Sequence, residues 1–274
     1  MEDRKYNIKI KKILIVYFMV FSFIMQETPH VVKEKMHLGD GHQRYHIWVN
    51  SYHSSGYFRS TFFRFSKHVQ KLSNFIDYDY LTRKNTAVAM ISDCTSNHTI
   101  LKSYLQELKK YFPVDVYRQC FDKYPKKQVQ ERMCNNYKFY ISFENSICED
   151  YITEKYSAPI DCGSIPIVMT PKINLKHLIP GSYINVFDFA SPKRLGEHLA
   201  NVSKSFKLYL EYFKWKQYYR VESTSIENDV CKMVEAIDES QTSTRMTDHL
   251  IHEIFNGRKC MNARDIYEII FRIF

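Results

Sequence analysis

The residues best suited to chemistry gather in one stretch, Ser142–Met169, with the sequence SFENSICEDYITEKYSAPIDCGSIPIVM. A helix is expected there from Asp150 to about Cys162, and Glu154 and Lys155 would lie near its start. A lysine in that place is unfavourable for the helix itself, because cations are better placed near the C-terminal end. Lys155 would therefore make more sense facing an anion, while Glu154 can accept hydrogen bonds from sugar hydroxyls. The pattern alone fits a solvated Glu–Lys pair on an exposed helix equally well.

Apolar runs around this stretch predict the elements that would position it. Strands are expected at Tyr137–Phe143 and Ser164–Met169, and upstream at Ala87–Ser92 and Val114–Tyr117. A helical apolar repeat over 100–108 separates the two upstream strands. Alternating strands and helices predict an α/β fold with a parallel sheet and right-handed crossovers. In such sheets ligands bind beyond the carboxyl ends of the strands, where a helix N-terminus favours phosphate.

The start signal of the expected helix and the tail of the chain complete this outline. Ser146, followed by Glu149 or Asp150, is the expected capping pattern. The tail from Pro192 is expected to be mostly helical, and the sequence contains no internal repeat.

Composition limits the classes of partner. The 274 residues allow one large domain or two small ones, and 45% hydrophobic residues suffice for a core. A net charge of +9 would suit an anionic partner. However, the bases are spread along the chain without a nucleic-acid-binding motif, so nucleic acid is not expected as a partner.

The N-terminus resembles a membrane anchor. Lys9, Lys11 and Lys12 precede an apolar run, Ile13–Met25, which is shorter than the roughly 20 residues of a full span. An uncleaved signal anchor would leave the N-terminus cytosolic and the rest of the chain lumenal. A cleaved signal peptide lacks its usual small-residue site here, and a buried strand is the remaining alternative.

The cysteines and sequons agree with a lumenal location. Seven cysteines without a CxxC pair suggest that some form disulfides and that at least one stays free. Asn97 and Asn201 head N-glycosylation sequons. Asp77 and Asp79 form a lone D-x-D, which is too common a pattern to predict a manganese site, so no metal ligand is assigned.

Several segments in a fixed order resemble one family. The runs YKFYISFENSICEDYITEK and GSIPIVM closely resemble the signature of the α1,3/α1,4-fucosyltransferases, glycosyltransferase family 10. The stretch Tyr183–Tyr219 is similar to the segment that follows the family's donor site, and AVAMISDC and VDVY are similar to its preceding strands. The resemblance covers roughly residues 86 to 220.

The resemblance implies a fold, a reaction and a set of binding residues. The fold would be of the two-domain GT-B type, and the reaction an inverting transfer of L-fucose from GDP-fucose to GlcNAc of glycoprotein or glycolipid glycans. Glu154 would hold the donor ribose and Lys155 the diphosphate. Asn145, Tyr151 and Tyr140 would line the donor pocket. No metal is required in this scheme, and manganese would at most stimulate.

Localisation and domain organisation also follow from the resemblance. The protein would be a single-pass type II protein of the Golgi membrane with a lumenal catalytic domain. Residues 1–28 would form the cytosolic tail and anchor, 29–85 a stem with a remnant of the acceptor domain, and 86–274 the donor domain. The acceptor half is thus expected to be largely missing.

The chain departs from the family pattern in three places. No counterpart of the catalytic glutamate of the acceptor domain can be placed, so the catalytic residues are unassigned, and His53 stands where the family has an arginine. The family's diphosphate-binding arginine falls at Ile100 or Leu101, with Lys102 the nearest cation. Pro159 would remove a hydrogen bond inside the helix that carries Lys155. These departures leave an alternative open, an inactive membrane-anchored fragment that binds GDP-fucose or pairs with an active relative.

Overall fold

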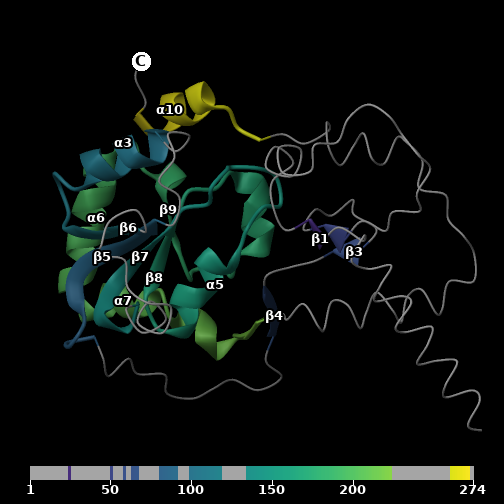
Figure 1. Cartoon of the computed structure of the whole chain (residues 1–274). Helices are drawn as coiled ribbons and strands as arrows, with labels where there is room; N and C mark the ends of the chain where they lie inside the picture. The colour runs from purple at the N-terminus through teal and green to yellow at the C-terminus, as the bar shows by residue number, and fades with distance from the viewer. Residues whose placement is uncertain are drawn as a thin grey trace, which may run out of the picture. The chain divides into compact units, whose positions relative to one another are not determined.

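The computed structural model describes residues 24–25, 50–51, 58–59, 63–67, 80–91, 99–118, 134–223 and 260–271. The chain divides into two compact units, and the larger one contains 63–147, 152–223 and 260–274. Its centre is a five-stranded parallel sheet with the order β6-β5-β7-β8-β9 (Figure 1). The strands are β5 (Lys84–Ile91), β6 (Val114–Arg118), β7 (Tyr137–Ser142), β8 (Ile165–Val168) and β9 (Ile184–Asn185). The predicted α/β class is confirmed.

The strands of the sheet are apolar because both faces are covered. All four residues of β8 are buried, and β7 has five buried residues of six. Strands of parallel sheets characteristically form such continuous apolar runs, since helices pack on each side. The four strands predicted from the sequence correspond to β5, β6, β7 and β8, with ends that agree within one residue except the start of β5, which lies three residues earlier than predicted.

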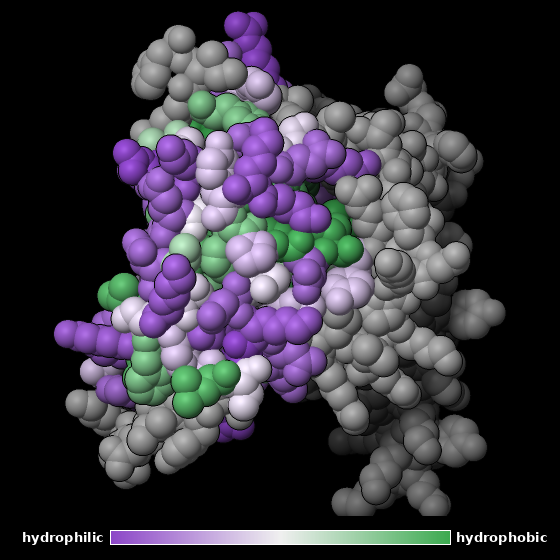
Figure 2. Space-filling model, turned by 90° about the vertical axis from the view of Figure 1, so that its left-hand side faces the viewer, coloured by the Kyte–Doolittle hydropathy of each residue, from purple (hydrophilic) through white to green (hydrophobic). Residues whose placement is uncertain are grey.

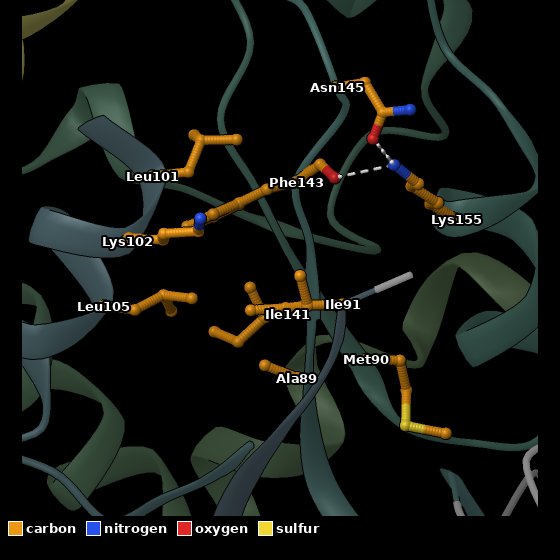
Figure 3. Close-up of a pocket in the computed structure, with 10 residues that line it drawn as sticks. All are labelled: Ala89, Met90, Ile91, Leu101, Lys102, Leu105, Ile141, Phe143, Asn145 and Lys155. Atoms are coloured by element: carbon orange, nitrogen blue, oxygen red, sulfur yellow. Dashed lines mark hydrogen bonds between the residues drawn. The ribbon is translucent and has the colours of Figure 1, made fainter. Parts of the chain in front are cut away.

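Helices cover the sheet and supply the rest of the core. They are α3 (Thr99–Leu108), α5 (Glu154–Asp161), α6 (Pro192–Lys204), α7 (Phe206–Glu211) and α10 (Ala263–Phe271). The 3-10 turns are η2 (Cys134–Asn136), η3 (Lys172–His177), η4 (Val186–Asp188) and η5 (Lys214–Gln217). One apolar cluster joins α3, α6 and α10 to the sheet through residues such as Leu108, Leu199, Ile270 and Phe139. Figure 3 shows α3 and α5 contributing side chains beside the ends of β5 and β7.

The outer faces of α3 and α6 are exposed to solvent. Figure 2 shows this side of the larger unit as a mostly hydrophilic surface with separate hydrophobic areas. These helices and their ends carry ion pairs between residues three positions apart, Lys110 with Glu107 and Arg194 with Glu197. Exposed pairs of this kind contribute little to stability. The two helices are therefore held mainly by their buried apolar faces.

Short strands lie outside the central sheet. In the larger unit β4 (Phe63–Lys67) pairs antiparallel with β10 (Tyr219–Ser223), which interrupts the tail that was predicted to be mostly helical. The other unit contains β1 (Ile24–Met25), β2 (Asn50–Ser51) and β3 (Phe58–Arg59) in a parallel three-stranded sheet.

Several sequence predictions fall on residues outside the described ones. They concern the apolar run up to residue 23, the D-x-D at 77–79 and the sequon at Asn97. No helix among the described residues is both long and apolar enough to cross a membrane.

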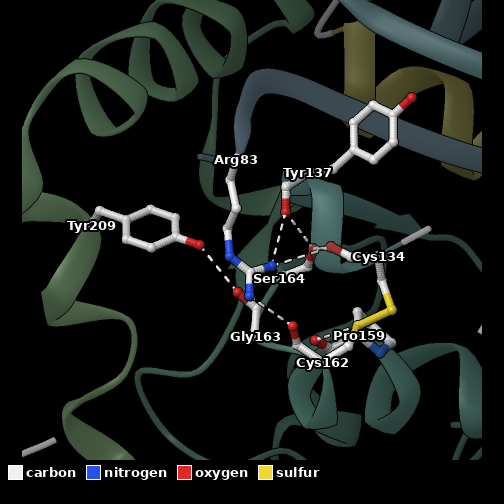
Figure 4. The surroundings of a disulfide bond; sticks show 8 residues. All are labelled: Arg83, Cys134, Tyr137, Pro159, Cys162, Gly163, Ser164 and Tyr209. Atoms are coloured by element: carbon white, nitrogen blue, oxygen red, sulfur yellow. Dashed lines mark hydrogen bonds between the residues drawn. A yellow bond between two sulfur atoms is a disulfide. The ribbon is translucent and has the colours of Figure 1, made fainter. Parts of the chain in front are cut away.

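A disulfide and a buried arginine fix the C-terminal end of α5 to the start of β7 (Figure 4). The disulfide joins Cys134 in η2 to Cys162 directly after α5. Arg83 is only 6% exposed, and its guanidinium donates hydrogen bonds to the carbonyls of Cys134 (3.2 Å) and Cys162 (2.9 Å). Cys148 and Cys260 are also disulfide-bonded, which confirms that some cysteines pair. The end of α5 is thus anchored covalently and by backbone contacts.

Gly163 is required where α5 turns into β8. Its φ of +78° lies in the left-handed region, and an added Cβ would stand 2.8 Å from the Arg83 Nη2 atom. Gly181 has the same φ of +78°, but nothing lies within 4 Å of the position of its Cβ. Comparing alanine substitutions at the two glycines therefore separates the free-energy cost of backbone strain from the cost of displacing Arg83.

We predict that Gly163→Ala lowers the free energy of unfolding more than Gly181→Ala does. Left-handed backbone costs about 1–2 kcal/mol for a residue with a Cβ, and both variants pay that cost. Gly163→Ala additionally displaces a buried guanidinium from its carbonyl partners, which adds about 1–3 kcal/mol. Urea unfolding of both variants measures the difference, and equal losses would show that the contact with Arg83 has no energetic role.

Candidate functional site

A cavity lies at the carboxyl ends of β5 and β7, the edge at which parallel sheets usually bind ligands (Figure 3). Its volume is about 50 Å³, and the residues that line it are Ala89, Met90, Ile91, Leu101, Lys102, Leu105, Ile141, Phe143, Asn145 and Lys155. Sites for drug-sized ligands occupy about 300–1,000 Å³, so this cavity would receive only part of a nucleotide sugar. The charged side chains in its lining are two lysines, which suits an anionic group.

Lys155 is directed toward this cavity from the first turn of α5 (Figure 3). Its ammonium group donates hydrogen bonds to Asn145 Oδ1 at 2.7 Å and to the carbonyl of Phe143 at 3.2 Å. The side chain is 28% exposed. The structure therefore brings Lys155 and Asn145 together at the end of β7, and Lys155 is not the fully solvated helix residue that the sequence pattern also allowed.

The other residues predicted for the site lie in different surroundings. Glu154, the first residue of α5, is exposed. Tyr140, in the middle of β7, packs beside Val88 and Tyr137. Tyr151 is buried and packs with Cys148, and both belong to the smaller compact unit. Asn201 is exposed on α6. Their binding and glycosylation roles stay predictions.

Glu144 is the residue that sequence reasoning missed. Its side chain is 6% exposed, and its carboxylate accepts hydrogen bonds from the Thr153 backbone N–H at 2.8 Å and from the Thr153 hydroxyl at 2.9 Å. Lys155 Nζ lies 3.9 Å from Glu144 Oε2. Burial raises the pKa of Glu144 to about 7, although Lys155 and the bonds from Thr153 act in the opposite direction. One sequence feature could have revealed Glu144. It follows the apolar strand predicted at Tyr137–Phe143 directly, and a charged residue in that place can become buried with the strand.

Thr153 connects this carboxylate to the N-terminus of α5. It has an extended backbone, with φ −112° and ψ −172°, and its hydroxyl accepts a hydrogen bond from the Lys155 N–H at 3.3 Å. Thr153 is therefore the N-cap, and the predicted start at Ser146 with Glu149 or Asp150 is wrong. The physical reason is visible at Asp150, whose φ of +60° is incompatible with a right-handed helix.

The proline expected to disturb α5 lies within the helix. Pro159 is buried, and α5 continues past it to Asp161. The ring removes one backbone donor, as predicted. Each end of α5 has its own anchor. Glu144 holds the N-terminal end through Thr153, and the disulfide holds the C-terminal end at Cys162.

Metal ligands are not grouped in the part of the chain that the structure describes. There, no cluster of three or more histidine, cysteine or acidic side chains is arranged to hold a metal ion.

We predict that Thr153→Val destabilises the protein more than loss of an ordinary helix cap does. Removing a cap costs about 0.5–2 kcal/mol, and leaving the buried Glu144 carboxylate with one fewer donor adds about 1–3 kcal/mol. Ser191→Ala is the matched control, because Ser191 caps α6 through Arg194 N–H. Thr153→Ser keeps the hydroxyl and should stay close to the unchanged protein in urea unfolding. Equal losses for Thr153→Val and Ser191→Ala would contradict the role of Glu144.

Comparison with known proteins places these features in a family. Residues 80–253 match the model of the C-terminal region of glycosyltransferase family 10, the fucosyltransferases. The mouse 4-galactosyl-N-acetylglucosaminide 3-alpha-L-fucosyltransferase 9 is 40% identical over 134 residues, which cover 48% of this chain and 37% of the mouse protein. Human 3-galactosyl-N-acetylglucosaminide 4-alpha-L-fucosyltransferase FUT3 is 38% identical over 132 residues, 47% of this chain and 36% of that protein.

A solved structure is also similar in part. The crystal structure of an alpha1,3-fucosyltransferase with GDP-fucose aligns with a TM-score of 0.48 and 21% identity, over 61% of this chain and 50% of that one. The match to the curated relatives spans little more than a third of their length. Since the family model covers more than half of the chain, the protein belongs to glycosyltransferase family 10, the fucosyltransferases.

Proposed function

We propose that the chain binds GDP-fucose with the diphosphate at the cavity between β5 and β7. The observation that carries this proposal is the pair of lysines in the cavity lining, Lys155 from α5 and Lys102 from α3. They approach the carboxyl edge of the sheet from two different helices, so a diphosphate between them would be contacted from both sides. Lys102 would then supply the cation that the family pattern places two or one residues earlier.

The chemistry of fucosyl transfer explains why fixed cations belong there. When the bond between fucose and phosphate breaks, negative charge develops on the GDP leaving group. A lysine that Asn145 and the Phe143 carbonyl position beside the cavity can stabilise that charge by exchanging one of these partners for phosphate. In this proposal Glu154 holds the ribose and Asn145 lines the donor pocket, while the pocket roles expected for Tyr151 and Tyr140 stay predictions. The transfer inverts the sugar centre without an obligatory metal, and its catalytic base is unassigned.

The acceptor in the proposal is GlcNAc of glycoprotein or glycolipid glycans. The names of the mouse and human relatives both specify a galactosyl-N-acetylglucosaminide acceptor, and they differ in the linkage formed. We extend the acceptor class, but neither linkage, to this chain.

The proposal includes a donor domain over residues 86–274, a stem at 29–85, an anchor within 1–28, and a type II orientation in the Golgi membrane. The anchor and its orientation rest on the basic residues and the apolar run at the N-terminus.

We predict that Lys155→Ala weakens GDP binding by about 10- to 100-fold. That range corresponds to the loss of one charge-assisted contact, about 1.5–3 kcal/mol. Lys102→Ala should weaken binding as well, and the double variant more than either. Lys110→Ala is the control. Lys110 follows α3, the helix that carries Lys102, but it pairs with Glu107 on the exposed surface. Calorimetric titration with GDP measures the affinities, and an unchanged affinity of Lys155→Ala would remove that residue from the site.

Transfer is tested separately from binding. Incubation with GDP-[14C]fucose and galactosyl-GlcNAc acceptors should yield labelled glycan. Binding of GDP-fucose without labelled glycan would support the alternative function, a chain that binds the donor but does not transfer it.

A further inference from the structure

Glu144 is a buried acid that the proposed donor contacts do not use. Its carboxylate accepts hydrogen bonds from two Thr153 donors, and among the residues that the structure describes the close cation is Lys155 Nζ at 3.9 Å. Of the other charged groups on the elements around it, Glu154 on α5 opposes its ionisation, and Lys102 on α3 lines the cavity. A carboxylate in this position is stabilised in its charged form mainly by Lys155 and Thr153.

Lys155 cannot serve two anions equally well. Burying a carboxylate is costly unless a nearby positive charge and hydrogen bonds offset the loss of water. A diphosphate in the cavity would attract the Lys155 ammonium group and would add negative charge beside the lysine that neighbours Glu144. Both effects favour the neutral form of the Glu144 carboxyl.

We propose that Glu144 is the internal counterion of Lys155 and takes up a proton from solvent when a nucleotide diphosphate occupies the cavity. This inference rests on the proposed function, because it requires the diphosphate at Lys155. The protonated carboxyl keeps one oxygen that can accept the hydrogen bond from the Thr153 N–H. The N-terminus of α5 would therefore stay in place while the charge of the site changes by one.

The pKa of Glu144 supports a response near neutral pH. Burial already raises this pKa to about 7, so about half of the carboxyls are protonated at pH 7 in the empty protein. A ligand that raises the pKa further causes uptake of up to about half a proton per site at that pH. By linkage, uptake on binding means that affinity falls as pH rises, by up to about tenfold between pH 6 and pH 8.

The experiment is calorimetry of the full chain with GDP-fucose in buffers of different ionisation enthalpy. GDP-fucose is the suitable probe because its phosphodiester groups do not titrate near neutral pH. The dependence of the observed enthalpy on the buffer gives the number of protons taken up. We expect about 0.5 proton at pH 7, much less at pH 5.5, and weaker binding at pH 8 than at pH 6.

Variants assign the proton to Glu144. Glu144→Gln has nearly the same shape and cannot titrate, so its proton uptake should be absent and its affinity should vary little with pH. Thr153→Val removes a hydrogen bond that favours the charged carboxyl, which raises the pKa of Glu144. The pH at which this variant takes up a proton on binding should therefore be higher. The inference is overturned if the unchanged chain takes up no proton, or if Glu144→Gln takes up as many. Failure of Lys155→Ala to weaken GDP binding would instead overturn the proposed function.

Discussion

The site depends on the hydrogen bonds between Glu144 at the end of β7 and Thr153 at the start of α5. They join a buried acid to a helix cap, and the cap sets the position of Lys155 two residues later. Because a buried carboxylate without partners is strongly unfavourable, the loop between β7 and α5 must return to supply them. Lys155 is thereby directed over the carboxyl edge of the sheet, close to Asn145 and the Phe143 carbonyl.

The C-terminal end of α5 is fixed by a disulfide and by hydrogen bonds from a buried arginine. There the Cys134–Cys162 disulfide and the buried Arg83 hold the helix end to the segment before β7. β7 and α5 are thus joined at both of their ends, once covalently and once through a buried polar contact. A helix of eight residues has little stability of its own, so these anchors and its packing determine where it lies.

The sequence predicted the central sheet well and the local geometry of the site poorly. Strands β5, β6, β7 and β8 follow from apolar runs, because burial on both faces leaves few alternatives for such segments. The predicted start of α5 was wrong, because Ser146, Asp150 and Thr153 are all acceptable cap residues, and the choice depends on the buried partner of Thr153. Glu144 was missed for the same reason, since burial of an acid after a strand is a tertiary property. Lys155 was singled out by its unusual place in the first turn of the expected helix, whereas Asn145 was recognised only through the family signature, and the structure places them together.

A crystal structure of this chain with bound GDP would test the central claim most directly. The account predicts that phosphate oxygens take the place of Asn145 Oδ1 or the Phe143 carbonyl as partners of the Lys155 ammonium group, at the carboxyl ends of β5 and β7. It also predicts that Thr153 keeps its contact with Glu144 in the complex. A diphosphate bound elsewhere, with Lys155 still bonded to Asn145 and Phe143, would contradict it.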